Sequence, residues 1–328
     1  MSVLVIAEHD RGDIAPGTLE AMAGARMLAA KLDCDVHAVV LGDPSGAVAG
    51  QLGAHGAAVV HTIDSDVLSD FGSEAYADGV CQLVAATSPK AVTANGTARG
   101  NEVLAQIAAR LDLPFSANIV DAVPSDTIDG KHCVTVTRHQ WGGTLLEDAN
   151  LVADTLLMTY ADHAFEPSEA PAAGTIQAFA AQIDPTFARS VIKDRTVTAA
   201  GVTLSTAPFV AGGGRGMGNP ESFAMLEELA ELLGGRVGCS RAVTNLGWRN
   251  HADQVGQTGT RIAPEVYLAS GISGATQHWV GAMGSKNIIA INTDKEANLV
   301  TKAGHAVVAD LHAVIPALID EVKRRQGA

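Results

Sequence analysis

The first half of the chain alternates between short apolar runs and longer stretches whose apolar residues recur every three or four positions. The short runs predict buried strands, and the longer stretches predict amphipathic helices between them. The expected strands are residues 3–7, 36–41, 57–61 and 90–94. The expected helices are residues 18–32, 45–52, 73–87 and 99–111. Strands that alternate with helices pair in parallel, so this half predicts a doubly wound sheet.

The rest of this half departs from that alternation. Residues 133–137 and 155–160 are expected to form further strands that extend the sheet in antiparallel fashion. Residues 165–184 contain the segment Glu-Pro-Ser-Glu-Ala-Pro-Ala-Ala-Gly, which is typical of a linker or a surface excursion.

The second half returns to alternating strands and helices. The expected strands are residues 207–211, 266–269, 287–291 and 305–309, and the expected helices are residues 221–233 and 311–325. We therefore expect an α/β protein with two doubly wound, mostly parallel-sheet domains.

Charge divides the chain between the same two halves. Residues 1–195 contain 11 basic and 25 acidic residues, whereas residues 196–328 contain 11 of each, so the net charge of −14 belongs to the first half. A chain of 328 residues has the length of two domains. We predict an acidic N-terminal domain at residues 1–195 and a second domain at residues 196–328 that holds any anionic ligand. The alternative is that surface charge simply varies along the chain.

Composition also excludes several classes of protein. An acidic chain with only 13 aromatic residues is unsuited to binding nucleic acid. The four cysteines are 47 or more positions apart and the histidines lack metal-ligand spacing, so we expect reduced thiols and no metal site. The N-terminus lacks a basic leader, and no run approaches the ~20 apolar residues of a membrane span. These features favour a cytoplasmic protein.

Glycine-rich and polar clusters follow the predicted strands of the second half. The segment Gly-Gly-Gly-Arg-Gly-Met-Gly at residues 212–218 lies between a strand and a helix, a context suited to binding phosphate. It does not match Gly-x-Gly-x-x-Gly, so by itself it is equally typical of a tight turn. Further clusters follow at residues 238–241, 254–259 and 271–278, and Asn292 and Asp310 come just after two later strands. Ligands of open α/β sheets bind at this carboxyl edge.

Together these clusters fit an extended dinucleotide. Arg215 and the helix starts near Gly218 and Ser273 are expected to hold phosphates, while Asn292 and Asp310 read ribose or adenine. The polar residues of 254–258 would donate hydrogen bonds to the edge of a redox-active ring. Arg241 would place a positive charge near that ring and raise its potential. A rival hypothesis is a hydrolase using Ser273 and His278, although no partner acid is identifiable.

At these positions the sequence resembles the alpha subunit of electron transfer flavoprotein. The family pattern includes Gly-Gly-Arg-Gly, Gly-Ala/Cys-Ser-Arg, Gln-Val-Gly-Gln-Thr-Gly and Gly-Ile-Ser-Gly-Ala-Ile-Gln-His, then Ala-Ile-Asn and Ala-Asp-Leu. This chain has these motifs in the same order at residues 213–216, 238–241, 254–259, 271–278, 290–292 and 309–311. The likeness over residues 1–195 is looser and rests on the opening strand and on residues 98–111.

The resemblance implies that the second domain is a Rossmann-like domain that binds FAD. In the family, Thr258 would bond near the reactive nitrogen of the ring, Arg241 would lie over the ring, and His278 would reach its pyrimidine carbonyl, with Ser240 close by. The residues at the family's flavin-contacting positions are Arg215, Ser240, Arg241, Gln254, Val255, Gly256, Gln257, Thr258, Ser273, Gly274, Ala275, Thr276, Gln277, His278, Asn292 and Asp310.

The resemblance also implies partners. The first domain would dock on a beta subunit that carries AMP. The heterodimer would then pass electrons from a partner dehydrogenase to an acceptor, typically a membrane-bound quinone reductase, with no catalytic residue of its own. The alternatives are an electron-bifurcating member that uses NADH and a second flavin, and a nucleotide-dependent oxidoreductase. Thr276 replaces the usual Ile, and residues 138–148 do not match well-known members, which favours a divergent branch.

Overall fold

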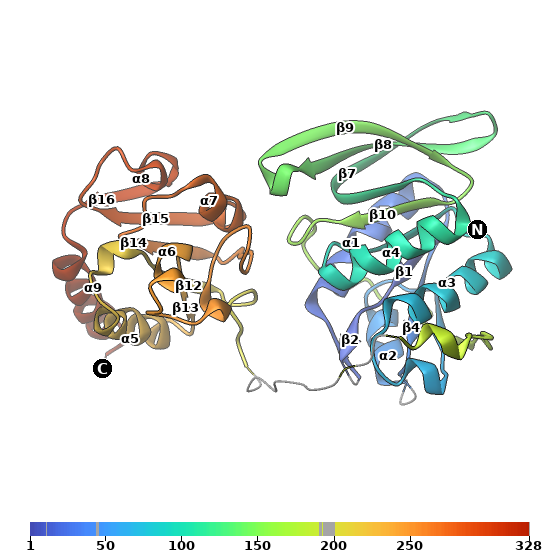
Figure 1. The fold of residues 1–328 in the computed structure, drawn as a ribbon, viewed down its shortest axis with the longest axis horizontal. Coiled ribbons are helices and arrows are strands. Elements are labelled where there is room, and N and C mark those ends of the chain that lie inside the picture. Colours follow the sequence, from blue (N-terminus) through green and yellow to red (C-terminus); the bar gives the residue numbers. More distant parts are fainter. Residues whose placement is uncertain (11, 44–45, 190–191, 193–200, 328) are drawn as a thin grey trace. The chain divides into compact units, whose positions relative to one another are not determined.

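Each of two units of the chain is built on its own largely parallel sheet (Figure 1). The computed structural model describes residues 1–10, 12–43, 46–189, 192 and 201–327. Unit 1 comprises Met1–Thr196 and unit 2 comprises Val197–Ala328. The predicted fold class, α/β with a mainly parallel sheet in each half, is confirmed.

Unit 1 has a nine-stranded sheet in the order β11-β5-β4-β1-β6-β10-β7-β8-β9. Its strands are β1 (Ser2–Ile6), β4 (Asp35–Leu41), β5 (Val59–Ile63), β6 (Ala91–Asn95), β7 (Phe115–Ile128), β8 (Lys131–Gln140), β9 (Leu145–Ala153), β10 (Leu156–Tyr160) and β11 (Thr175–Ala178). A separate ribbon pairs β2 (His9–Asp10) with β3 (Asp13–Ile14). The helices are α1 (Pro16–Lys31), α2 (Ala47–Ala54), α3 (Ser73–Thr87) and α4 (Ala98–Leu111).

The core of unit 1 lies on both faces of this sheet. Val3 and Val5 of β1 pack with α1 and α2 on one face, whereas Leu4 and Ile6 pack with α3 and α4 on the other. Successive side chains of a strand point to opposite faces, so a strand covered on both sides is apolar at every position. This is why residues 3–6 of β1 read as a continuous apolar run.

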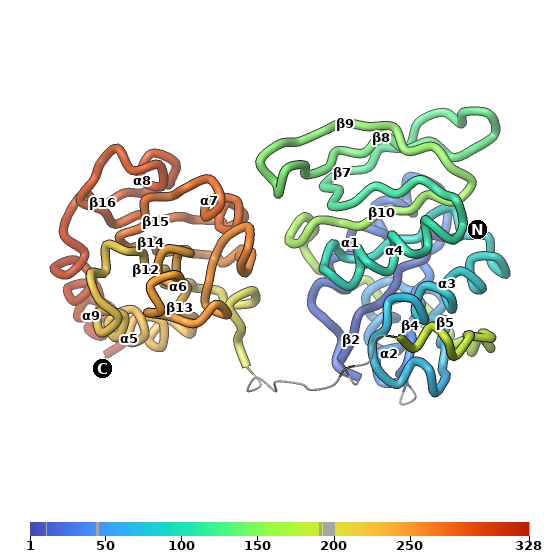
Figure 2. The backbone as a smooth tube through the Cα atoms, viewed as in Figure 1, coloured from blue at the N-terminus to red at the C-terminus, as the bar shows by residue number. Residues whose placement is uncertain are grey.

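The far part of this sheet differs from the prediction. Strands β7, β8 and β9 form an antiparallel extension beyond β10 (Figure 2). The antiparallel prediction was wrong for β10, which pairs in parallel with both β6 and β7. All five of its residues are buried, and such a strand belongs in the interior of a parallel sheet rather than in a half-exposed extension.

Residues 165–184 are more than a linker. They include β11, which pairs in parallel with β5 at the opposite edge of the sheet. The four residues of β11 are all exposed, so no apolar alternation marks them as a strand. Its backbone pairing is what covers the β5 edge.

Unit 2 has a five-stranded, fully parallel sheet in the order β13-β12-β14-β15-β16. Its strands are β12 (Phe209–Gly213), β13 (Arg236–Cys239), β14 (Val266–Ser270), β15 (Asn287–Asn292) and β16 (His305–Val308). Its helices are α5 (Ala224–Leu232), α6 (Arg241–Asn245), α7 (Thr276–Ala282), α8 (Asn298–Lys302) and α9 (Leu311–Gln326). Helices α5 and α9 pack on one face, while the loop before β14 and α7 and α8 pack on the other.

Single 3₁₀ turns complete the chain at Asp66–Leu68, Trp141–Gly143, Pro185–Phe187, Arg215–Met217, Glu221–Phe223 and His251–Asp253. Within the described residues, no helix has both the length and the apolar character that crossing a bilayer requires.

Candidate functional site

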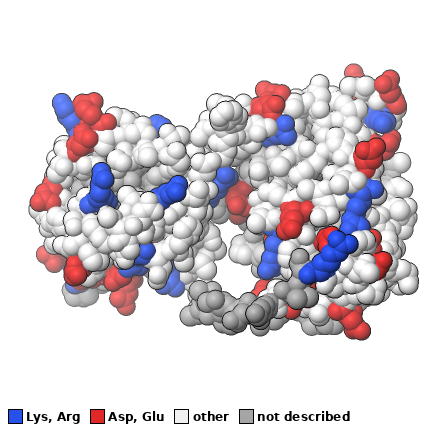
Figure 3. Space-filling model, in the orientation of Figure 1, with Lys and Arg blue, Asp and Glu red and all other residues white. Residues whose placement is uncertain are grey.

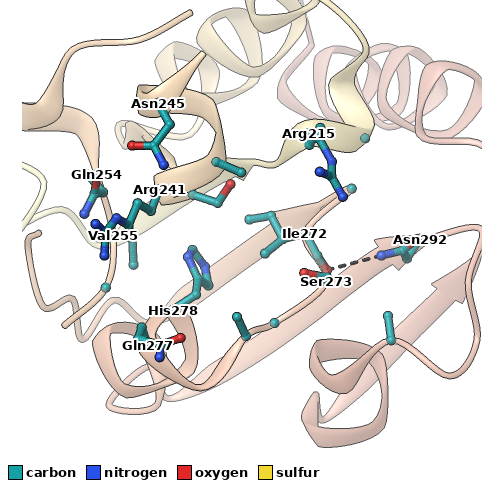
Figure 4. Close-up of a pocket in the computed structure, with 18 of the residues that line it drawn as sticks. Arg215, Arg241, Asn245, Gln254, Val255, Ile272, Ser273, Gln277, His278 and Asn292 are labelled. Carbon is teal, nitrogen blue, oxygen red and sulfur yellow. Dashed lines mark hydrogen bonds between the residues drawn. The ribbon is translucent and has the colours of Figure 1, made fainter. Parts of the chain in front are cut away.

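A cavity of about 540 Å³ lies at the carboxyl edge of the unit 2 sheet. Its walls come from the loops and helix starts that follow β12, β13, β14 and β15. Small-molecule sites typically measure ~300–1,000 Å³ and occur at this edge of open α/β sheets. Figure 4 shows Arg241 and His278 toward one end of the cavity, and Arg215 and Asn292 toward the other.

Fourteen of the sixteen predicted site residues line this one cavity. They are Arg215, Ser240, Arg241, Gln254, Val255, Gly256, Gln257, Thr258, Ser273, Gly274, Ala275, Gln277, His278 and Asn292. Thr276 and Asp310 are not among the lining residues. Asp310 accepts a hydrogen bond from the backbone nitrogen of His312 (2.9 Å) and caps α9, so its carboxylate has a structural partner and its role toward a ligand stays a prediction.

The cavity also has lining residues outside the sixteen predicted ones, three of which, Gly216, Gly271 and Ile272, lie within the predicted clusters. They are Gly216, Ala242, Asn245, Gly271, Ile272, Asp294 and Ala297. Asn245 lies one helical turn after Arg241 on α6, so helical spacing could have identified it. Asp294 follows the predicted Asn292 by two residues.

The glycines of residues 212–218 have a different role from the one predicted. Gly212 and Gly213 belong to β12, where they leave room for the rings of Tyr267 and Phe223. A Cβ on Gly214 would lie 2.1 Å from the carbonyl oxygen of Gly271, because the loops after β12 and β14 meet backbone to backbone. The Gly214 nitrogen donates to the Ser270 carbonyl oxygen at 2.9 Å. Gly214 and Gly216 therefore serve close packing between two loops, and Gly212 and Gly213 make room for rings beside the strand.

The predicted phosphate-binding helix start near Gly218 is not at the cavity. Helix α5 begins only at Ala224, after two 3₁₀ turns, and neither Gly218 nor the residues that begin α5 line the cavity. Arg215, which lies in the first of these turns, does line the cavity. The cationic side chain, rather than a helix dipole, is what this loop contributes.

Two guanidinium groups give the cavity a positive lining. Arg215 and Arg241 are exposed, and within the described part of the chain neither has an acidic partner in salt-bridge distance. Arg241 is the first residue of α6, directly after the N-cap Ser240. Unpaired guanidinium groups that share one cavity favour an anionic ligand.

The loop from Gln254 to Thr258 is held in place by side chains. The Thr244 hydroxyl donates to Oε1 of the Gln254 side chain at 2.7 Å, and Nε2 of Gln254 donates to the Thr258 hydroxyl oxygen at 3.0 Å. Gln254 is buried and both ends of its amide are bonded, so it organises the loop. Thr258 accepts in this bond and its hydroxyl donates to no other described residue, so its proton is available to a ligand.

His278 is the buried ionisable residue of the lining. Its Nε2 lies 2.8 Å from the Tyr267 hydroxyl oxygen, whereas its Nδ1 is buried with no hydrogen-bond partner among the described residues. Burial lowers the pKa of His278 from 6.5 to about 4, so the imidazole is neutral at pH 7. No hydrogen bond within the described residues joins it to Ser273, and a serine–histidine nucleophile pair is therefore not formed there.

Asn292 braces the rim from the neighbouring strand. Its amide nitrogen donates to the Ile272 carbonyl oxygen at 3.2 Å (Figure 4). Its side-chain oxygen accepts from the Asp294 backbone nitrogen at 3.1 Å. These bonds tie the loops after β14 and β15 together. Among the described residues, no group of three His, Cys, Asp or Glu side chains could hold a metal ion.

Comparison with known proteins identifies the family to which the chain that forms this cavity belongs. Residues 3–184 match the sequence profile of the electron transfer flavoprotein domain, and residues 203–283 match that of the electron transfer flavoprotein FAD-binding domain. The second match covers most of the cavity lining, and FAD is accordingly the cofactor of unit 2.

Curated relatives match over nearly the whole chain. The electron transfer flavoprotein subunit alpha of Thermoanaerobacterium thermosaccharolyticum is 33% identical over 98% of both chains. That of Megasphaera elsdenii is 31% identical over 99% of this chain and 97% of its own. Protein FixB of Bradyrhizobium diazoefficiens is 33% identical over 98% of this chain and 89% of its own. With these matches along both units, the chain belongs to the electron transfer flavoprotein alpha subunit family.

Proposed function

We propose that this chain is the alpha subunit of a heterodimeric electron transfer flavoprotein and holds FAD in the cavity of unit 2. In this proposal it carries electrons from partner dehydrogenases to an acceptor, typically a membrane-bound quinone reductase. The observation that carries the proposal is the gathering of fourteen separately predicted residues around a single cavity.

The lining fits FAD chemically. FAD supplies a ring that accepts and releases electrons, and it also carries an anionic pyrophosphate. Arg215 and Arg241 provide positive charge toward opposite ends of the cavity, and the buried Nδ1 of His278 lacks a partner that a ligand could supply. Val255 and Ile272 add apolar surface for a flat ring. The cavity therefore combines charge, hydrogen-bonding groups and apolar contact in one space.

The roles of single residues follow from their positions. Arg215 would hold the pyrophosphate through its bidentate fork. Arg241 would keep a fixed positive charge beside the ring, which favours the electron-rich reduced form and raises the redox potential. The free hydroxyl proton of Thr258 would be donated to the ring edge, with Ser240 nearby.

An electron carrier needs no acid or base that acts on a small substrate. His278 is committed to Tyr267, and Asp294 is the sole carboxylate among the described lining residues. No nucleophile in the lining is joined to a base, which supports electron carriage over hydrolysis.

A beta subunit is the expected companion. Several relatives are named as alpha subunits, and we infer that this chain likewise assembles with a beta subunit that carries AMP. Unit 1, which holds the acidic surplus, would provide the docking surface. On the face drawn in Figure 3 the acidic side chains are scattered among basic ones, so docking through charge alone is not expected.

Co-purification with the neighbouring beta-type subunit, followed by flavin quantitation, tests the proposal. We expect one FAD per heterodimer. Two flavins, or reduction by NADH, would favour the electron-bifurcating alternative. Absence of flavin from the purified heterodimer would overturn the proposed function.

A substitution tests the placement of the ring. Arg241→Ala should lower the redox potential of the bound flavin, because a positive charge beside the ring is removed. Arg325→Ala removes an equal charge from the exposed end of α9, outside the cavity, and should leave the potential unchanged. An unchanged potential in Arg241→Ala would place Arg241 away from the ring.

A further inference from the structure

A fully buried tyrosine lies directly behind the cavity. Tyr267 is in β14 and is completely inaccessible to solvent, and its hydroxyl oxygen lies 2.8 Å from Nε2 of His278 in the first turn of α7. Tyr267 does not line the cavity, so it cannot contact a ligand there directly. It acts on the site through His278.

Gly212 provides the space that Tyr267 occupies. Tyr267 is in register with Val210 of β12, and Gly212 is two residues further along β12 on the same face. A Cβ on Gly212 would lie 2.4 Å from the Tyr267 hydroxyl oxygen. The absent side chain lets the tyrosine ring lean toward the carboxyl edge of the sheet, where α7 begins.

The direction of the hydrogen bond follows from counting protons. Among the described residues, the Tyr267 hydroxyl is hydrogen-bonded to Nε2 of His278. If the hydroxyl donates, Nε2 accepts and the imidazole proton is on Nδ1. If instead Nε2 donates, the hydroxyl proton and the Nδ1 lone pair are both left without partners in the interior, and each such group costs free energy.

The surroundings of Nδ1 agree with the first arrangement. The backbone of Val255 lies beside the His278 ring and favours its protonated form, and Nδ1 has no hydrogen-bond partner among the described residues. A proton on Nδ1 is thus a buried donor that awaits an acceptor at the wall of the cavity. Figure 4 shows the His278 ring standing from α7 toward the cavity.

We propose that Tyr267 is a positioning residue: its hydroxyl donates to Nε2 of His278 and holds the imidazole in the neutral tautomer whose proton is on Nδ1. His278 then presents an N–H donor to a carbonyl group of the ligand. The identity of that ligand as the flavin ring rests on the proposed function. A donor that is oriented before the ligand arrives requires no reorganisation on binding.

Nitrogen NMR of the full chain without flavin tests the tautomer itself. The chain is labelled with ¹⁵N-histidine, and the His278 signals are assigned by their loss in His278→Gln. We expect Nδ1 to carry the proton in the wild type and part of the population to move to the Nε2–H form in Tyr267→Phe. Tyr160→Phe, an equally buried tyrosine of unit 1, should leave these signals unchanged.

Two results would overturn the proposal. An Nε2–H signal in the wild type reverses the direction of the hydrogen bond, and an unaltered tautomer in Tyr267→Phe removes the role of the hydroxyl. The wild-type spectrum decides the first point even where Tyr267→Phe fails to fold.

FAD affinity of the heterodimer provides the second readout. Loss of one oriented hydrogen bond should weaken FAD binding about fivefold in Tyr267→Phe, and Tyr160→Phe should match the wild type. Equal affinity in Tyr267→Phe contradicts a role toward the ligand. A wild-type heterodimer that binds no FAD would refute the proposed function, while the tautomer result on the flavin-free chain would stand by itself.

Discussion

The two units differ at the same edge of their sheets: unit 2 has a large cavity there, whereas unit 1 has a very small one. In unit 1 the first sheet strand, β1, lies between β4 and β6, and in unit 2 the first sheet strand, β12, lies between β13 and β14. The loops that follow such a strand and its neighbour enclose the usual binding crevice of an open α/β sheet. Unit 2 has a cavity of about 540 Å³ there, whereas unit 1 has one of about 20 Å³, room for roughly one water molecule.

A single carboxylate explains much of the difference. Glu8 follows β1, and its carboxylate accepts a hydrogen bond from the hydroxyl of Thr97, the N-cap residue of α4. Thr97 in turn accepts from the Gly100 backbone nitrogen at 2.9 Å. Unit 1 thus places its own carboxyl group at the helix start where a ligand phosphate would bind. At the corresponding edge of unit 2, the loops contain glycines and arginines that have no acidic partner among the described residues. The space for a ligand therefore remains open there.

The largest expected effect comes from disturbing the open edge. Gly214→Ala should destabilise unit 2 by ~3 kcal/mol and abolish FAD retention, because the new Cβ meets the Gly271 carbonyl oxygen at 2.1 Å. Gly304→Ala is the matched control, since its nearest neighbour would be 3.8 Å away. Urea unfolding and flavin content measure both effects. Wild-type flavin content in Gly214→Ala would contradict the loop packing described here.

A second prediction concerns acid. The lowered pKa of His278 means that the unfolded chain binds a proton between pH 6.5 and about 4 that the folded chain does not, so stability is lost as pH falls through this range. At ~1.4 kcal/mol per pKa unit, the flavin-free chain should lose about 3 kcal/mol.

His278→Gln should remove this part of the acid sensitivity. His312→Gln, an exposed histidine at the start of α9, should retain it. Urea unfolding at pH 7 and pH 4.5, followed by tryptophan fluorescence, separates the two variants. An equal loss of stability in wild type and His278→Gln would show that another group is responsible.

The closed edge of unit 1 should respond to pH in the opposite sense. Burial is the main cause that raises the pKa of Glu8, so its stabilising contribution is fully present below pH 4.5 and is lost as pH rises through the folded pKa. Glu8→Gln should therefore gain stability relative to wild type between pH 4 and pH 7, by ~1.4 kcal/mol for each unit of pKa shift. Glu169→Gln, at an exposed position, should show no such trend.

The smallest effect is expected far from either edge. Trp141, between β8 and β9, is 79% exposed, so Trp141→Ser should change the free energy of unfolding by no more than ~0.5 kcal/mol. Chemical denaturation of the isolated chain measures this. A loss above ~1 kcal/mol would mean that this tryptophan packs against the chain after all.

Prediction succeeded where the pattern is local. The helix at residues 73–87 agrees with α3 at both ends, because buried small and apolar residues recur on one face of it. Strands β7, β9 and β11 were missed, since they mix exposed and buried positions or are wholly exposed. Without regular alternation, backbone pairing alone makes them strands.

The residues of the site show the same contrast between local patterns, which were predicted, and contacts between distant segments, which were not. Motifs after β13 and β14 identified Arg241 and His278 as lining residues, because the carboxyl ends of parallel strands share an edge. The bracing roles of Gln254 and Asn292 were not predictable, since each depends on a partner in another segment, Thr244 of α6 and Ile272 in the loop after β14.

The sequence by itself determined the α/β class, the polar clusters that follow the strands, and the family. Only the tertiary structure decided that Tyr267 stands behind His278, that Gly212 makes room for it, and that Glu8 occupies the edge of unit 1. The physical reason is the range of the interactions. Periodicity and turn chemistry act over a few residues, whereas these contacts depend on which strands become neighbours and how closely their loops approach.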